Sequence, residues 1–176
     1  LRSARAPRHD ATTQLPLVPR RPGEAGVTTG VVGKGDRRTV PSTVVDRLFV
    51  YGTLRAGQTS RSLVEAYVKS AEPATARGTI YAFPSGHPGL VVDDGGVVHG
   101  ELITLTDLAS ALPLLDAYEG DDFARVLAEV TCASGTTWAW LYALASPELS
   151  RIGVRVTHGD WSRWLAEAGG PGQPPK

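Results

Sequence analysis

The chain has 176 residues, about the length of one domain, and its 18 Lys and Arg are balanced by 18 Asp and Glu, which excludes a role based on bulk charge. The balance hides an asymmetry, because residues 1–46 hold 8 basic and 4 acidic side chains whereas 47–176 hold 10 and 14. All 12 aromatic side chains lie in 47–176, and a segment without them buries too little apolar surface to offset its ordering entropy. We therefore expect a disordered basic extension over 1–46, a folded domain over 47–168 and a disordered tail over 169–176.

Several classes of protein are excluded by what the chain lacks. Cys132 is the single cysteine, so neither an internal disulfide nor a cysteine-based zinc cluster can form. No apolar run approaches the ~20 residues of a membrane span, and the N-terminus lacks the apolar core of a secretory signal. We expect a soluble, cytoplasmic domain without a membrane partner. A nucleic-acid-binding arm over 1–46 is an alternative, disfavoured because its basic residues are scattered and have no aromatic stacking partners.

The first half of the folded part predicts one helix among several strands. Residues 47–51 form a short apolar run that stops at Gly52, the pattern of a buried strand entering a tight turn. Residues 60–69 place apolar side chains at helical spacing after Ser60, a favourable N-cap. Three strands are expected next, separated by Gly- and Pro-rich loops: 76–83, 90–92 and 96–105.

The second half predicts two helices around a pair of strands. One helix is expected to begin at Asp107, to be kinked or interrupted at Pro113, and to stop at Gly120. This order, without regular strand–helix alternation, indicates an α+β fold built on a small mixed sheet or barrel with flanking helices. The remaining elements expected are two strands and an amphipathic helix: 124–132, 136–144 and 161–168.

The first candidate site is the turn formed by Tyr51, Gly52, Thr53, Leu54 and Arg55. A strand that stops at glycine lets the backbone approach a ligand closely, and successive N–H groups in such a turn form an anion-binding concavity. The Arg55 guanidinium adds a planar donor suited to a carboxylate. The alternative is an ordinary strand and turn, with Tyr51 in the core and Arg55 in solvent.

The second candidate site is the acidic segment around Glu119. If a helix ends at Gly120, Glu119 lies at the negative end of the helix dipole, with Asp116 one turn before it and Asp121 and Asp122 after it. Both effects disfavour ionisation, so the pKa of Glu119 should be raised toward the range that a general acid/base needs. A solvated acidic loop and a hard-cation site are the alternatives, although the spacing is not that of a calcium loop. Because the chain offers neither a credible nucleophile nor a metal cluster, the two segments together point to acid/base chemistry on a substrate that bears a carboxylate.

Several motifs, taken in order, resemble the gamma-glutamylcyclotransferase-like (AIG2-like) family. The resemblance implies a small mixed barrel around a central pocket. It also implies that the turn Tyr51–Leu54 holds the α-carboxylate and amine end of a γ-glutamyl group, and that Glu119 is the acid/base. The matching segments are FVYGTLRAGQ (49–58), GHPGLV (86–91), VHGEL (98–102), LLDAYEG (114–120) and GDW (159–161).

The implied reaction is the release of 5-oxoproline from a γ-glutamyl amine or γ-glutamyl amino acid. The α-amine of the substrate is the nucleophile, so neither a cofactor nor a metal is expected, and the protein's task is to fold the substrate back on itself and move protons. Two departures from the family pattern are noted, Phe123 where a Tyr is frequent, and His87 where an aromatic residue is frequent. The alternative function is a non-catalytic module that binds a small carboxylate of the γ-glutamyl type.

Overall fold

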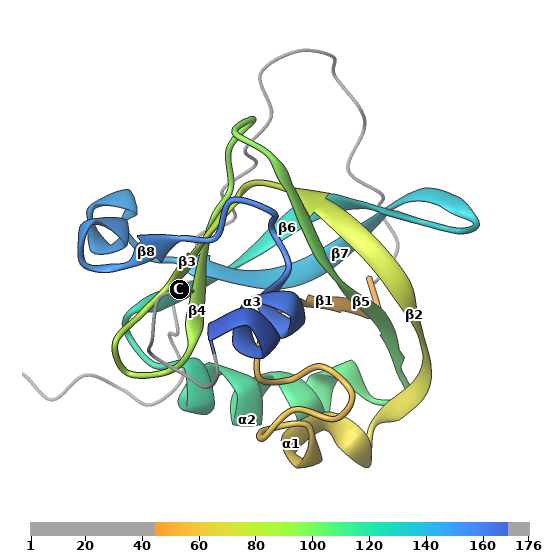
Figure 1. Ribbon diagram of the computed structural model, residues 1–176. Helices are drawn as coiled ribbons and strands as arrows, with labels where there is room; N and C mark the ends of the chain where they lie inside the picture. The colour runs from red at the N-terminus through yellow and green to blue at the C-terminus, as the bar shows by residue number, and fades with distance from the viewer. Residues whose placement is uncertain (1–44, 169–176) are drawn as a thin grey trace, which may run out of the picture.

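The computed structural model describes residues 45–168, and its centre is a closed barrel of five strands in the order β1-β5-β2-β6-β7 (Figure 1). Most neighbours are antiparallel, and the barrel closes where β1 lies parallel to β7 at the pair Leu48 and Trp140. Closure leaves the barrel without a free edge. The barrel strands are β1 (Arg47–Val50), β2 (Val68–Arg77), β5 (Val97–Leu105), β6 (Phe123–Cys132) and β7 (Gly135–Leu144).

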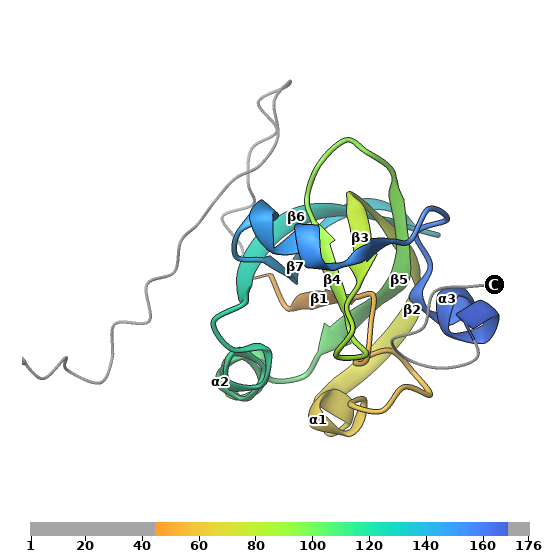
Figure 2. The same cartoon turned by 60° about the vertical axis from the view of Figure 1, so that its left-hand side comes forward.

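A second, three-stranded sheet and three helices flank the barrel (Figure 2). The sheet has the order β4-β3-β8, and the helix α2 carries the residues of the acidic segment. No helix within 45–168 is long and apolar enough to span a membrane. The flanking elements are β3 (Thr79–Ala82), β4 (Pro88–Val91), β8 (Val154–Arg155), α1 (Ser62–Glu65), α2 (Leu108–Glu119), α3 (Trp161–Ala168) and the 3-10 helix η1 (Pro147–Ile152).

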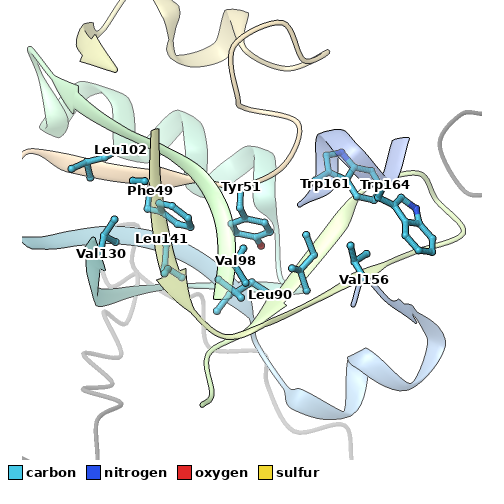
Figure 3. Close-up of a cluster of buried hydrophobic side chains, with 14 of the residues drawn as sticks. Phe49, Tyr51, Leu90, Val98, Leu102, Val130, Leu141, Val156, Trp161 and Trp164 are labelled. Atoms are coloured by element: carbon cyan, nitrogen blue, oxygen red, sulfur yellow. The ribbon is translucent and has the colours of Figure 1, made fainter. Parts of the chain in front are cut away.

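Alternate residues of β7 pack into two different hydrophobic clusters. Ala139, Leu141 and Ala143 belong to one cluster, which also contains Phe49 and the fully buried Trp161 of α3 (Figure 3). The second cluster lies between the barrel and the helices α1 and α2, with members that include Leu48, Val64, Leu115 and Tyr142. The strand is therefore apolar on both faces because each face packs against a different layer.

The α+β barrel with flanking helices is confirmed, and α2 begins and ends as the sequence predicts. The Asp107 side chain accepts a hydrogen bond from Ser110 N at 3.0 Å and caps the helix. Gly120 follows its last residue, and Pro113 is accommodated inside. The domain boundary at Arg47 stays a prediction, although Val45 and Asp46 already hydrogen-bond to Trp140 and Leu105. The predicted disorder of 1–44 and 169–176 lies outside the described residues.

The prediction of a helix over 60–69 is wrong for most of its length. The helix α1 covers four residues, and its N-cap is Arg61 rather than Ser60, whose hydroxyl instead contacts the Tyr118 hydroxyl. Further along, the Tyr67 carbonyl accepts hydrogen bonds from both Thr106 N and Thr106 Oγ1, so the chain enters the sheet. The long strand β2 was missed because its sequence, VKSAEPATAR, is largely polar and lacks a strict alternation.

The strand predicted over 76–83 is in fact two strands that belong to different sheets. It divides at Gly78, where the chain leaves β2 of the barrel and enters β3. The elements η1 and β8 were also missed, because they are short and mostly exposed, so they carry no hydrophobic period.

Candidate active site

A cavity of about 240 Å³ opens where β1 ends, between the loop that enters β4 and the C-terminus of α2. Both candidate segments of the sequence therefore meet in space, although more than 60 residues separate them along the chain. The walls combine a backbone turn, two carboxyl residues and several aromatic rings. The lining residues are Phe49, Val50, Tyr51, Gly52, Thr53, Leu54, His87, Pro88, Tyr118, Glu119, Asp122, Phe123 and Tyr142.

The turn that follows β1 lines this cavity with three consecutive residues, Gly52, Thr53 and Leu54. It is closed by a hydrogen bond of 3.1 Å from Arg55 N to the Gly52 carbonyl. Within 45–168 we find no acceptor for the N–H groups of Gly52, Thr53 or Leu54. Unpaired N–H groups at a cavity wall are suited to bind an anion such as a carboxylate.

Gly52 is required by the close approach of the first residue of β4. A Cβ atom at this position would lie 2.5 Å from Cγ of Pro88, which is buried and also lines the cavity. A proline ring has little freedom to move aside, so any side chain at position 52 would displace one cavity wall from the other.

Glu119 is the last residue of α2, and its partly buried carboxyl group lines the cavity. Burial raises the pKa of Glu119 from its ordinary value of 4.5 to about 7. No hydrogen bond or ion pair to this carboxyl group is found within the described chain. A carboxyl group in this state can both accept and donate a proton near neutral pH.

The direction of this shift was predicted correctly, but its predicted cause was wrong. The neighbouring Asp116 is engaged elsewhere, since it accepts hydrogen bonds from the Tyr142 hydroxyl at 2.6 Å and from Arg125 Nη1 at 3.0 Å. Asp121 and Asp122 are exposed to solvent, which screens their charge. Loss of hydration, rather than repulsion by neighbours, therefore controls the ionisation of Glu119.

The Tyr51 side chain forms part of the floor of the cavity. Its hydroxyl donates a 2.8 Å hydrogen bond to the Tyr142 carbonyl, and the residue is only 7 % exposed. Burial and the nearby Glu119 both raise the pKa of Tyr51 well above its usual value. Tyr51 therefore stays neutral and acts as a fixed apolar surface with an engaged hydroxyl (Figure 3).

Arg55, predicted to bind the substrate carboxylate, does not line the cavity. Its Nη1 atom lies 3.0 Å from Asp160 Oδ1, and its Nε atom lies 3.7 Å from Glu101 Oε1. Glu101 also accepts hydrogen bonds from Ala56 N and from Arg61 Nη1. The guanidinium thus braces the turn from the outer side, and a direct contact with substrate stays a prediction.

Two residues with a clear place at the site were not predicted from the sequence. The Tyr118 hydroxyl contacts Thr53 Oγ1 at 3.1 Å and Ser60 Oγ at 2.7 Å, so it joins α2 to the turn. Tyr142 lines the cavity from β7, and its hydroxyl donates a hydrogen bond to Asp116. Because Tyr118 directly precedes Glu119 in the sequence, its place at the site could have been predicted. Tyr142 reaches the site only through the folding of the barrel.

His87 and Phe123, the two departures from the family pattern, lie together at one end of the cavity. Their ring centroids are 6.0 Å apart, and His87 also lies 5.4 Å from the ring of Phe83. Burial lowers the pKa of His87, so the imidazole is neutral at pH 7. The Ser85 hydroxyl contacts its Nδ1 atom at 3.1 Å.

The carboxyl groups around Glu119 do not gather into a cation site. Within the described chain no three His, Cys, Asp or Glu residues lie close enough together to hold a metal ion. Asp116 instead pairs with Arg125, as described above. The chemistry that this arrangement supports is proton transfer next to a bound carboxylate.

A family model for gamma-glutamyl cyclotransferase, AIG2-like proteins matches residues 48–163, which is more than half of the chain. The chain belongs to this family. The family match spans all the strands of the barrel and both cavity segments, so the resemblance noted from the sequence motifs is confirmed.

Solved structures similar to this family member show the same fold. YkqA from Bacillus subtilis matches with a TM-score of 0.56 and 22 % identity, over 69 % of this chain and 41 % of its own. The uropathogenic E. coli-specific protein c4763 gives a TM-score of 0.55 and 22 % identity, over 70 % and 98 %. The protein PH0828 from Pyrococcus horikoshii gives 0.52 and 23 %, over 70 % and 95 %. This chain thus spans about two fifths of the length of YkqA, and no curated protein matches it.

Proposed function

We propose that this protein is a γ-glutamyl cyclotransferase-type enzyme that releases 5-oxoproline from a γ-glutamyl amine or γ-glutamyl amino acid. Membership of the gamma-glutamyl cyclotransferase, AIG2-like family supports this assignment. The observation that carries it is the position of Glu119, a partly buried carboxyl group without a partner, in the same cavity as the N–H groups of Gly52–Leu54.

In the proposed complex, the N–H groups of the turn hold the α-carboxylate of the γ-glutamyl group. This anchoring folds the substrate so that its α-amine faces its own γ-carbonyl carbon, and such an intramolecular attack gains a large effective molarity. The cavity has the volume for a molecule the size of a glutamyl group, with the apolar ring of Tyr51 beneath it.

Glu119 moves the protons of the reaction. The α-ammonium of the substrate first loses one proton to solvent, and the free amine attacks the γ-carbonyl carbon to form the C–N bond of the lactam. Glu119 takes the second proton from this nitrogen and delivers it to the departing nitrogen as the original amide bond breaks. The products are 5-oxoproline and a free amine, which takes up the first proton, so that no water is consumed.

The test is 5-oxoproline release by the full chain and by Glu119→Gln, measured by liquid chromatography on a panel of γ-glutamyl amines and γ-glutamyl dipeptides. General acid/base catalysis contributes about 10²–10⁴-fold, so we expect the variant to lose at least 100-fold in kcat while it stays folded. The kcat/KM of the unchanged protein should rise with pH and reach half its maximum near pH 7, because Glu119 must be ionised to accept a proton.

A matched control keeps this test specific. Glu72→Gln changes a carboxyl group on β2 that lies outside the cavity, and its turnover should equal that of the unchanged protein. Equal turnover by Glu119→Gln and the unchanged protein would reject Glu119 as the acid/base. If γ-glutamyl ligands raised the melting temperature but gave no product at high protein concentration, the non-catalytic binding module would be the better description.

A further inference from the structure

His87 is held in place by the loop that joins β3 to β4. Its carbonyl accepts a 3.0 Å hydrogen bond from Phe83 N, and the Gly86 N–H donates to the Phe83 carbonyl at 2.9 Å, so the loop is a closed turn. The imidazole packs beside the rings of Phe83 and Phe123, as described above. Backbone and ring contacts therefore both fix this side chain at the wall of the cavity.

The two ring nitrogens of His87 have different surroundings. Nδ1 lies 3.1 Å from the Ser85 hydroxyl, which donates to it when the neutral ring carries its proton on Nε2. Nε2 has no hydrogen-bond partner within 45–168, and unlike Nε2 of His158 it is not a buried atom. Asp122 is the charged group that acts on this ring, and its effect does not reverse the lowering of the His87 pKa by burial. His87 therefore offers a neutral ring with an accessible Nε2 atom.

The other side-chain donors that line the cavity already have partners. The Tyr51 hydroxyl donates to a backbone carbonyl, and the Tyr142 hydroxyl donates to a carboxylate. The hydroxyls of Thr53 and Tyr118 contact each other at 3.1 Å. Among the cavity side chains of the described chain, the ring of His87 thus supplies a donor that is not committed to another residue.

The proposed reaction needs such a donor. When the α-amine attacks, the γ-carbonyl oxygen gains the negative charge of a tetrahedral intermediate. In the proposed complex the N–H groups of Gly52–Leu54 hold the α-carboxylate, and Glu119 serves the two nitrogen atoms, so this oxygen requires a different group. A donor that is already fixed in place stabilises the developing charge without having to reorient, as water would.

We propose that His87 is a second catalytic residue, whose Nε2–H donates a hydrogen bond to the γ-carbonyl oxygen of the substrate. This inference rests on the proposed function and adds to it the group that stabilises the intermediate. As the C–N bond of the lactam forms, the carbonyl electron pair moves onto the oxygen, and it returns when the original amide bond breaks. His87 keeps its proton throughout. Ser85 is a positioning residue, because its hydroxyl keeps that proton on Nε2.

The experiment measures kcat and KM for 5-oxoproline release, with the γ-glutamyl compound of the panel above that the unchanged protein turns over fastest. His87→Phe keeps an aromatic ring beside Phe83 and Phe123 but removes the N–H group. Loss of one donor to such an oxygen costs about 10²–10³-fold in kcat, so we expect a fall of about 100-fold with KM within about 3-fold.

Two further variants separate the N–H group from the shape of the side chain. His87→Gln carries an amide N–H group at a similar distance from the backbone, and it should recover at least about 10-fold of the lost kcat. Ser85→Ala leaves the ring in place but removes the hydroxyl that orients its proton, and kcat should fall about 3- to 10-fold. The matched control is His99→Phe on β5, an exposed histidine outside the cavity, whose kcat should equal that of the unchanged protein.

The pH profile distinguishes a hydrogen-bond donor from an acid/base. In His87→Phe, kcat/KM should still reach half its maximum near pH 7, because Glu119 sets this value. A clear displacement of this pH would show that His87 itself exchanges a proton in the reaction, which would overturn the inference.

The remaining outcomes separate this inference from the proposed function. Full kcat in His87→Phe, or equal losses in His87→Phe and His87→Gln with lowered melting temperatures, would overturn the role of the N–H group and leave the cyclotransferase assignment standing. If the unchanged protein released no 5-oxoproline from any compound of the panel, the proposed function would fail, and the role of His87 would fail with it.

Discussion

Three carboxyl groups near the cavity show how the surroundings of a residue decide its role. Glu101 is held by Arg61 and by the backbone of Ala56, so it ties the turn to β5. Asp116 is held by Arg125 and Tyr142. Glu119 has lost part of its hydration without gaining such donors, and burial raises its pKa to about 7. The same chemical group therefore acts as a brace in two places and is available for proton transfer in the third.

At this scale we predict that Tyr118→Phe weakens substrate binding more than it slows chemistry. The change removes hydrogen bonds to Thr53 and Ser60, so the turn loses its tie to α2. KM should rise about 3- to 10-fold with kcat within 2-fold, and stability should fall by about 1 kcal/mol. Steady-state kinetics and chemical denaturation measure both effects.

The control for this change is Tyr81→Phe on β3, outside the cavity, which should alter neither constant. A fall in kcat with KM unchanged would show instead that the Tyr118 hydroxyl takes part in the reaction itself.

At the scale of elements, the segment that leads into α3 supports the turn that follows β1. The Gly159 carbonyl accepts a 2.8 Å hydrogen bond from His99 N of β5. The Asp160 carboxylate accepts hydrogen bonds from Ser162 N at the start of α3 and from Arg55 next to the turn. The segment Gly159–Trp161 thus joins α3, the barrel and the turn. This motif therefore has a supporting role that requires no contact with substrate.

We predict that Gly159→Ala destabilises the fold severely. Gly159 has φ +68°, and an added Cβ would lie 1.9 Å from the Val97 carbonyl oxygen, which belongs to the barrel and cannot move independently. Gly57→Ala is the matched control, since Gly57 has φ +76° with no atom within 4 Å of the added Cβ. The control should lose about 1–2 kcal/mol from the backbone conformation alone.

Thermal unfolding of both variants measures the difference. We expect Gly159→Ala to yield little folded protein, and a melting temperature equal to that of Gly57→Ala would contradict the steric argument.

At the scale of the whole molecule, the site exists because a closed barrel brings distant segments together. The end of β1 lies beside the loop before β4 and the end of α2, and the helices α1 and α2 cover one side of the barrel (Figure 2). Burial of the Glu119 carboxyl group lowers the stability of the whole fold when the group is ionised. The reason is that the ionised form is less favourable in the folded protein than in the unfolded chain.

We therefore predict that Glu119→Gln is more stable than the unchanged protein at pH 8. Because the pKa of Glu119 is raised in the folded state, its contribution to stability is complete below pH 4.5 and is lost as pH rises through about 7. Allowing for solvent screening of a partly exposed group, the gain of the variant at pH 8 is roughly 2 kcal/mol, or about 6 °C in Tm.

Denaturant titrations of both proteins at pH 4 and pH 8 test this expectation. The two should be equally stable at pH 4, and a difference that did not change with pH would mean that the carboxyl group is already well hydrated.

Much of the fold was open to prediction from local signals. Asp107 and Gly120 marked the ends of α2, and the alternation of β7 marked a buried strand. Local signals failed in β2, whose polar sequence becomes a strand because β5 and β6 pair with it on either side. They also failed at Ser60, where a tertiary contact with Tyr118 replaced the expected helix cap.

For the candidate site, the sequence alone determined which residues are present and in what order: a turn with free N–H groups after a buried strand, and a glutamate at the end of a helix. Only the tertiary structure decided that the two share one cavity and that Arg55 faces Asp160 instead. The reason is physical. Residue type and spacing govern local hydrogen bonding, whereas hydration, burial and the pairing of charges depend on which distant segments the closed barrel brings into contact.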